Sequence, residues 1–332
     1  MKTYLIRRLL LIVPTFLGIS VLTFLVVQLS PGNPLLEKLR RGGEGGLAAA
    51  TIPPEYVAQM KKLYGLDKPI PVRYAVWLRR LVLFDFGDSY KDGRPVITKI
   101  KETLPITLQL SIISILLVYL LSIPLGVYSA RYQYSWSDTL ITFLLFILYS
   151  LPSFWVAMLL MYFLGGGRHL EWFPVYGISS QGADQWPWHQ WLADRTWHLA
   201  LPVFCLTYGG LAGLSRYARA GMINEIRQDY IRTARAYGFS ERTVIYKYAM
   251  RNSLIPIITL LGTLLPSLIG GSVIIESIFS IPGMGRLTFE AILSRDYPLI
   301  MGILSISALL TLLGLILSDI LYAVVDPRIR FE

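Results

Sequence analysis

The sequence has 332 residues, of which 54% are hydrophobic and only 16% are charged, and its mean hydropathy is +0.53. A typical soluble domain carries about 25% charged residues, and the charges here are grouped into blocks separated by long uncharged tracts. This pattern predicts a membrane protein and argues against an ordinary soluble domain. The formal net charge of +10 then indicates basic loops beside anionic lipid rather than nucleic-acid binding.

The chain begins with basic residues (Lys2, Arg7 and Arg8) followed by an uncharged stretch, Leu9–Leu29. This stretch is longer than the apolar core of a signal peptide, which has about 7–15 residues. We therefore predict that residues 1–30 hold the N-terminus and a retained first membrane span.

Five further uncharged stretches are long enough to cross the hydrocarbon core, which takes roughly 20 apolar residues. The predicted fold class is therefore an all-α membrane protein with six transmembrane helices, at Leu9–Leu29, Leu104–Ala130, Thr139–Leu164, Thr196–Ser215, Asn252–Ile275 and Tyr297–Ser318. Lys and Arg concentrate in cytoplasmic loops of membrane proteins. With the N-terminus inside, the inner segments hold 14 of them and the short outer loops hold 4. This bias predicts that both termini are cytoplasmic.

Residues 31–103 follow the first span and are predicted to form a small extracytoplasmic domain. Helical spacing of apolar residues predicts helices at Glu55–Tyr64 and Val72–Leu83. Two interpretations remain open: a structural cap over the outer side of the membrane core, or a surface that contacts a solute. Residues 104–332 form the predicted five-helix core.

Residues 165–195 form a second outer loop, which is rich in tryptophan. Trp186, Trp188 and Trp191 could be a docking surface for an outer partner. They could equally belong to a helix that lies in the membrane interface, where amphipathic rings are common. The sequence does not decide between these two interpretations.

Residues 216–251, here called the basic segment, are predicted to lie on the cytoplasmic side between spans four and five. Gly238 is suited to end a helix because glycine readily takes a positive φ, and Ser240 is a good N-cap for a second helix. Helical spacing places one face of the first helix at Met222, Ile226, Tyr230, Thr233, Ala234 and Tyr237. This helix–Gly–helix element, with Ala234 and Ala236 as small residues, could enter a groove on another protein or rest on anionic lipid.

Ionisable residues near a membrane core are candidate functional groups. Glu276 lies at the outer end of predicted span five and Asp319 at the inner end of span six. Each could anchor the structure, or could act in a gate or pathway. Gly270, Gly271 and Ser272 could allow close helix packing or could line a translocation route.

Several kinds of chemistry are not predicted. The single cysteine, Cys205, lies in an apolar tract, and the three histidines lack the spacing of a metal site. No nucleophile–base pair is recognisable, and no Gly-x-x-x-x-Gly-Lys-Ser/Thr sequence occurs. We therefore expect no metal, no cofactor and no enzymatic activity. If transport is driven by ATP, another polypeptide must supply the motor.

The basic segment resembles the coupling loop of ABC-importer permeases, whose pattern is Glu-Ala-Ala, three residues and then Gly. Arg232-Thr233-Ala234 stand in the Glu-Ala-Ala positions, which departs from the general pattern but is similar to the dipeptide/oligopeptide/nickel branch. Other stretches resemble the same branch along the whole chain: Leu5-Ile6-Arg7-Arg8, Tyr64-Gly65-Leu66-Asp67-Lys68-Pro69, Leu151-Pro152-x-Phe154-Trp155, Arg295-Asp296-Tyr297-Pro298 and Asp326-Pro327-Arg328. Phe84-Asp85-Phe86-Gly87-Asp88-Ser89 looks most like the Yej-type oligopeptide importers.

The resemblance implies one half of a type I importer in the bacterial inner (plasma) membrane. Its implied partners are a second, non-identical permease subunit, two cytoplasmic ABC ATPases and an extracytoplasmic solute-binding protein. It implies peptides or peptide-like solutes as the cargo, with nickel chelates, oligosaccharides or a self-contained secondary transporter as alternatives. The implied ATPase contact lies at Tyr230, Arg232, Thr233, Ala234, Arg235, Ala236 and Gly238.

Overall fold

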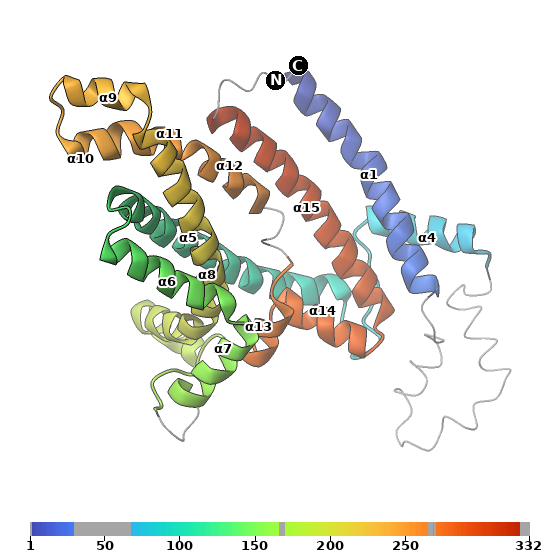
Figure 1. Cartoon of the computed structure of the whole chain (residues 1–332). Coiled ribbons are helices and arrows are strands. Elements are labelled where there is room, and N and C mark those ends of the chain that lie inside the picture. Colours follow the sequence, from blue (N-terminus) through green and yellow to red (C-terminus); the bar gives the residue numbers. More distant parts are fainter. Residues whose placement is uncertain (1, 30–67, 166–169, 265–267, 269, 326–332) are drawn as a thin grey trace.

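The computed structural model describes residues 2–29, 68–165, 170–264, 268 and 270–325 (Figure 1). Within these ranges the chain is helical and forms no strand beyond one isolated antiparallel bridge between Asp88 and Pro95. This agrees with the predicted all-α class. The longer helices are α1 (Lys2–Leu29), α4 (Ile70–Val82), α5 (Val96–Arg131), α6 (Trp136–Ser150), α8 (Trp188–Ile226), α12 (Ile255–Leu264), α14 (Met284–Leu293) and α15 (Tyr297–Val325).

Shorter elements connect these helices. They are α7 (Ser153–Leu160), η3 (Ala183–Gln185), α9 (Asp229–Ala236), α10 (Glu241–Thr243), α11 (Met250–Ser253) and α13 (Val273–Ile278). Two elements, η2 (Met161–Gly165) and η4 (Val244–Ala249), are π-helical. A π-turn holds one residue more than an α-turn and is often found at functional sites.

Four helices of the described chain, α1, α5, α8 and α15, are long and apolar enough to cross a membrane. The pair formed by α6 and the continuous stretch Ser153–Gly165 adds a fifth candidate if it is one span bent by 94°. The predicted span Asn252–Ile275 does not appear as one long helix, because α12 has ten residues and α13 begins only at Val273. The described residues thus give four or five candidate spans, and the predicted count of six is not confirmed.

The bend between α6 and α7 follows from Pro152. Proline lacks an N–H and disfavours helical backbone at the residue before it, and Leu151 is accordingly extended, with φ −86° and ψ 126°. The carbonyl of Leu151 accepts a hydrogen bond from the hydroxyl of Tyr208 on α8, at 2.8 Å. The bend therefore has a buried polar partner on a neighbouring helix.

Helices α5 and α8 pack along each other at the centre of the molecule (Figure 1). Small residues permit the close approach: a Cβ added to Gly126 of α5 would lie 2.7 Å from the carbonyl oxygen of Ser215 and would overlap Ala218 on α8. The hydroxyl of Ser122 also donates to the carbonyl of Leu211, at 3.1 Å. Close packing through small residues is typical of membrane helices.

Helices α1 and α15 pack side by side, with an ion pair between Arg8 and Asp319 at 2.7 Å. The start of α1 and the end of α15 consequently lie at the same end of the molecule. Figure 1 shows that α9 and α10 of the basic segment lie at this end too.

Helix α4 confirms the predicted helix Val72–Leu83 within one or two residues. It packs against α1, where Phe24 contacts the rings of Tyr74 and Trp77. The other helix predicted in residues 31–103, Glu55–Tyr64, lies outside the described residues. The predicted extracytoplasmic domain is therefore described only from residue 68 onward.

Candidate functional site

The basic segment begins on α8 and then turns sharply. Helix α8 ends at Ile226, and α9 begins at Asp229 after a short turn through Arg227 and Gln228. The prediction of one continuous helix ending at Gly238 is therefore wrong. Met222 is buried, but Tyr237 is 79% exposed, so the predicted single face does not exist. The turn shifts the helical periodicity, and no glycine or proline marks it in the sequence.

The predicted stop at Gly238 is confirmed. Its φ is +77°, a left-handed conformation that strains residues with a Cβ. Its N–H donates to the carbonyl of Arg235 at 2.9 Å, and the N–H of Phe239 donates to the carbonyl of Ala234 at 3.3 Å. Nothing lies within 4 Å of an added Cβ, so glycine is required here for conformation and not for space.

The predicted N-cap at Ser240 is confirmed as well. Its hydroxyl accepts a hydrogen bond from the N–H of Thr243 and so caps α10. Glu241 in this first turn also pairs with Arg235, with Nε 2.7 Å from Oε1. This exposed ion pair joins α9 to α10 across the glycine turn.

One face of the hairpin is buried against its own chain. Ile231 and Ala234 of α9 lie in a cluster of buried residues that also contains Val127, Ala130, Met222, Val244, Ile245 and Ala249. Ala234 is only 6% exposed. Its methyl group therefore packs against its own chain, whereas Ala236 is exposed.

The opposite face of the hairpin is open. The exposed residues there are Arg232, Thr233, Arg235, Ala236 and Tyr237. Arg232 pairs with the neighbouring, exposed Asp229 at 3.2 Å. Tyr237 supplies an exposed aromatic ring on this face. This surface combines cations and aromatic side chains, which are frequent in protein interfaces.

Tyr230 fastens the hairpin to the helices beside it. Its hydroxyl donates to the carboxylate of Glu225 on α8 and accepts from the side-chain amide of Asn252 on α11 at 3.0 Å. Burial and the hydrogen bond to Glu225 raise the pKa of Tyr230 above its ordinary value. The neutral phenol therefore links α8, α9 and α11.

The predicted pathway or gate residues lie around a buried carboxylate. Glu276 on α13 is 1% exposed. Its Oε1 accepts hydrogen bonds from the hydroxyl of Thr107, at 3.1 Å, and from the N–H of Ser272, at 3.3 Å, while its Oε2 accepts from the N–H of Arg286, at 2.9 Å. The carboxylate thus joins α5, α13 and α14.

Two glycines make room for this carboxylate. Gly271 has a φ of +62°, and an added Cβ would overlap Oε1 of Glu276. A Cβ on Gly283 would lie 2.5 Å from Oε2 and 2.7 Å from the hydroxyl oxygen of Thr107. Gly270, by contrast, is exposed and has open space around it. The structure therefore brings Gly271, Ser272 and Glu276 together and leaves Gly270 outside the contact.

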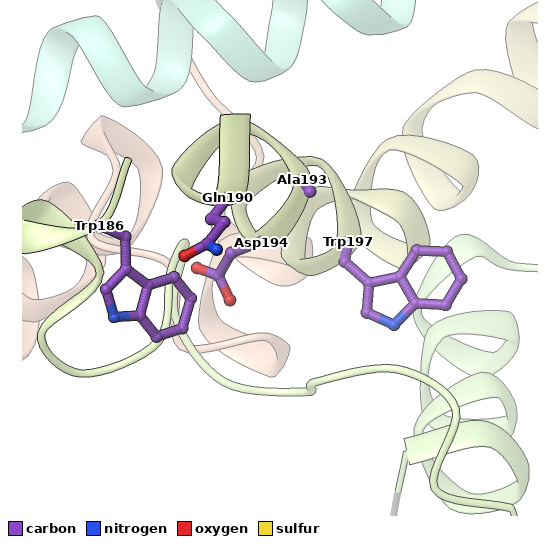
Figure 2. A pocket seen from close by; sticks show the side chains of 5 residues that line it. All are labelled: Trp186, Gln190, Ala193, Asp194 and Trp197. Carbon is purple, nitrogen blue, oxygen red and sulfur yellow. The ribbon is translucent and has the colours of Figure 1, made fainter. Parts of the chain in front are cut away.

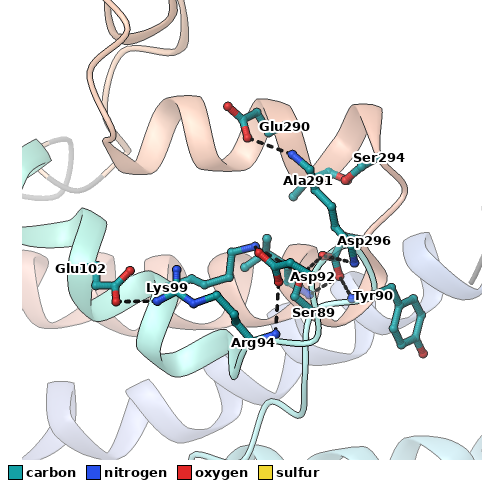
Figure 3. Close-up of polar contacts among 12 residues, drawn as sticks. Ser89, Tyr90, Asp92, Arg94, Lys99, Glu102, Glu290, Ala291, Ser294 and Asp296 are labelled. Carbon is teal, nitrogen blue, oxygen red and sulfur yellow. Dashed lines mark hydrogen bonds and ion pairs between the residues drawn. The ribbon is translucent and has the colours of Figure 1, made fainter. Parts of the chain in front are cut away.

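A second buried carboxylate, Asp296, connects two of the stretches that resemble the importer family, residues 84–89 and 295–298. It precedes α15 and is fully buried. It accepts hydrogen bonds from the hydroxyl of Ser89 and from the N–H of Tyr90, the latter at 3.0 Å (Figure 3). Lys99 on α5 donates to Ser89 at 3.2 Å and to Asp92 at 2.8 Å. The segment before α5 is thereby fastened to the junction of α14 and α15.

The tryptophan-rich loop forms an open groove of about 490 Å³ at the start of α8. Figure 2 shows the indole rings of Trp186 and Trp197 on either side of Gln190 and Asp194. Asp194 accepts hydrogen bonds from the N–H and hydroxyl of Ser180, at 2.8 and 2.7 Å. Its carboxylate is therefore engaged in holding the loop.

The described ranges contain no group of three or more His, Cys, Asp or Glu that could hold a metal ion. Cys205 is buried within α8 among apolar residues.

Comparison with known proteins identifies the family. Residues 122–331 match the family described as binding-protein-dependent transport system inner membrane component, and residues 1–111 match its N-terminal part. The chain belongs to this family. The permease is 41% identical over 332 residues to the oligopeptide transport system permease protein AppB of Bacillus subtilis, with all of both chains covered.

Two further relatives extend the comparison. The permease is 38% identical over 362 residues to the inner membrane ABC transporter permease protein YejB of Escherichia coli O157:H7, again with both chains fully covered. It is 35% identical over 347 residues to the dipeptide transport system permease protein DppB of Alkalihalophilus pseudofirmus, also over the full length of both. The predicted resemblance is thus confirmed, and the chain is a transport component and not an enzyme.

Proposed function

We propose that this permease forms half of the membrane pathway of an ATP-driven importer of short peptides. The relatives named as oligopeptide and dipeptide permeases support this cargo. The partners in the proposal are a second, non-identical permease subunit, two cytoplasmic ATPases and an extracytoplasmic solute-binding protein. Both termini and the basic segment would face the cytoplasm, and residues 31–103 and 165–195 would lie outside.

The proposal rests on the structure of the basic segment. Its hairpin is closed by Gly238 and the Arg235–Glu241 pair, and is seated on a buried apolar cluster that includes residues of α5 and α8. Its outer face leaves cations and aromatic rings exposed. A hairpin that is packed in this way onto long apolar helices is suited to bind a separate protein and to transmit its movement to the helices in the membrane.

The proposed ATPase contact is the exposed part of residues 230–238, namely Tyr230, Arg232, Thr233, Arg235, Ala236 and Tyr237 around Gly238. Ala234 would not touch the ATPase. It supports the proposed site because its buried methyl group packs the hairpin against α5 and α8. The sequence holds no P-loop motif, so a separate chain would hydrolyse the ATP. Glu276, Gly271 and Ser272 are proposed to shape the pathway indirectly, by holding α13 and α14 against α5.

Substitution at Gly238 tests the proposal, because a larger side chain would meet no neighbouring atom there. The only cost of the substitution is the positive φ of the backbone. Gly238→Val places a β-branched residue at a positive φ, which costs about 1–3 kcal/mol and should reshape the turn. Gly238→Asn is the matched control, since asparagine tolerates this conformation. In proteoliposomes that contain the whole importer, we expect Val to abolish ATP-dependent peptide uptake and Asn to preserve most of it.

The amount of permease in the membrane should be equal for both variants. Normal coupling of ATP hydrolysis to uptake in Gly238→Val would contradict the proposed coupling site. Uptake by the permease alone, without any ATPase subunit, would contradict the proposed function as a whole.

A further inference from the structure

A partly buried ion pair joins α6 to the part of the basic segment that belongs to α8. Asp138, in the first turn of α6, is 3% exposed. Arg219 on α8 binds it with two hydrogen bonds, from Nε to Oδ1 at 2.9 Å and from a terminal nitrogen to Oδ2 at 2.7 Å. Such a two-point arginine–carboxylate contact fixes both position and orientation.

The start of α6 is held to this pair by its own turn. Ser135 caps α6 by accepting from the N–H of Asp138, at 3.2 Å. The N–H of Tyr134, whose φ is +66°, donates to Oδ2 of Asp138 at 3.0 Å. A displacement of Arg219 would therefore move the whole first turn of α6 and not a single side chain.

Arg219 lies one helical turn before Met222 on α8. The side chain of Met222 is completely buried in the cluster that seats the hairpin of the basic segment. On the same stretch of α8, Ala218 touches Gly126 of α5 so closely that a Cβ on that glycine would overlap it. The basic segment, α5 and α6 therefore converge on the last turns of α8.

The ion pairs within the α9–α10 hairpin are more exposed to solvent. In the pair between Arg232 and Asp229, both side chains are largely exposed, and exposed pairs contribute little because water and salt screen them. In the pair of Asp138 and Arg219 the carboxylate is buried and the arginine side chain is 29% exposed, so water and salt screen this pair less. With its two hydrogen bonds and its buried carboxylate, the contact between Asp138 and Arg219 is therefore better suited than the exposed pair to transmit a displacement.

We propose that Asp138 and Arg219 are positioning residues that carry the movement of the basic segment into α6, and through the bend at Leu151–Pro152 into α7. This inference rests on the proposed function, because it assumes that an ATPase moves the basic segment. In this proposal the pair acts through the helices that it joins and not by contact with ATP or cargo. Its role is to make α6 follow α8 during the transport cycle.

The test uses the complete importer in proteoliposomes and two readouts. The first is peptide uptake per ATP hydrolysed for Asp138→Asn and Arg219→Lys. The second is the distance between spin labels on Trp136→Cys in α6 and Tyr246→Cys in the basic segment, in a Cys205→Ser background. Trp136 and Tyr246 are exposed in the structure. Distances are compared without nucleotide and with ATP trapped on the ATPases.

Without substitution of the pair, we expect the distance between the two labels to be the same in both nucleotide states, because α6 follows the basic segment. In Asp138→Asn the distance should change on ATP trapping, and uptake per ATP should fall about tenfold, within the usual range of coupling between sites. Arg219→Lys keeps the charge but loses the two-point contact, so we expect a smaller change in the same direction. Glu102→Gln breaks a pair of similar length with Arg94, at 2.6 Å, whose side chains are both exposed, and should alter neither readout.

The outcomes separate the inference from the proposed function. If the wild-type complex shows no ATP-dependent uptake, the proposed function is wrong. If wild type is coupled and the variants are coupled equally well, only the inference is wrong. If uptake per ATP falls in the variants but the distance between the labels stays the same in both nucleotide states, the pair has only a structural role. That result would also overturn the inference. If Asp138→Asn fails to assemble, Arg219→Lys decides by the same criteria.

Discussion

Thr107 on α5 donates its hydroxyl hydrogen to Glu276 on α13, at 3.1 Å, and both side chains are fully buried. The same hydroxyl oxygen accepts the N–H of Met284 at the start of α14, at 2.7 Å. The side chain of Thr107 thus forms hydrogen bonds with two residues that are far away in the sequence. Buried polar groups that lose a partner are costly, so this contact should matter for stability.

Replacing Thr107 with Val keeps the shape of the side chain and removes the hydroxyl. The N–H of Met284 then lacks its acceptor and Glu276 loses one donor, and each unsatisfied buried group costs about 1–3 kcal/mol. We expect a clearly lower thermal unfolding temperature for the purified permease in detergent. Thr142→Val is the matched control, because Thr142 on α6 is exposed. Equal unfolding temperatures for the two variants would contradict this account of Thr107.

Replacing Tyr208 with Phe tests the bend between α6 and α7. The variant removes the hydroxyl that donates to Leu151, and the loss of one such hydrogen bond costs about 1 kcal/mol. We expect a small fall in stability and faster hydrogen exchange of the amides just after Pro152. Tyr149→Phe on exposed α6 surface should change neither quantity. Faster exchange across the entire molecule would instead indicate general unfolding and not a local role at the bend.

The contacts of Asp92 predict a dependence of stability on acidity. Burial alone would raise the pKa of Asp92, but hydrogen bonds from Lys99, from the N–H of Arg94 and from Ser89 outweigh it and hold the pKa below its usual range. A carboxyl group with a lowered pKa stabilises the fold above its unfolded pKa of about 3.9 and loses this effect as the pH falls through the folded value.

The comparison of wild type with Asp92→Asn measures this effect. We expect wild type to unfold at the higher temperature near neutral pH and the difference to shrink as the pH falls below about 4. The variant has no titrating group at position 92, so it is the reference against which the wild type is compared at each pH. A difference that stays constant down to acidic pH would mean that the charge of Asp92 is not involved.

The sequence predicted those parts of the fold that depend on local chemistry. Long apolar helices, the stop at Gly238 and the cap at Ser240 are all present. Each depends on one residue or on composition over a short stretch. The same holds for α4, whose helical spacing was visible.

Features that depend on contacts between distant segments could not be predicted in this way. The turn after α8 carries no glycine or proline, and Ile231 and Ala234 are buried because of residues on α5 and α8 and in η4. The partners of Glu276 and Asp296 lie far away in sequence. The pair of Asp138 and Arg219 had a local signal on one side only: Ser135-x-x-Asp138 before an apolar run is similar to a helix-capping pattern.

The π-helical turns of η4 have a consequence for how insertions and deletions act on this permease. Because Val244–Ala249 is wound more widely than an α-helix, the chain could shed a single residue there and still form an unbroken helix. Because the wider turn takes up the surplus residue locally, its loss would leave the residues on either side facing nearly the same way. Loss of a residue from an α-helical stretch such as α9 would instead rotate everything beyond it by about 100°. The direction of the exposed aromatic and cationic surface is therefore least sensitive to a change in chain length at η4.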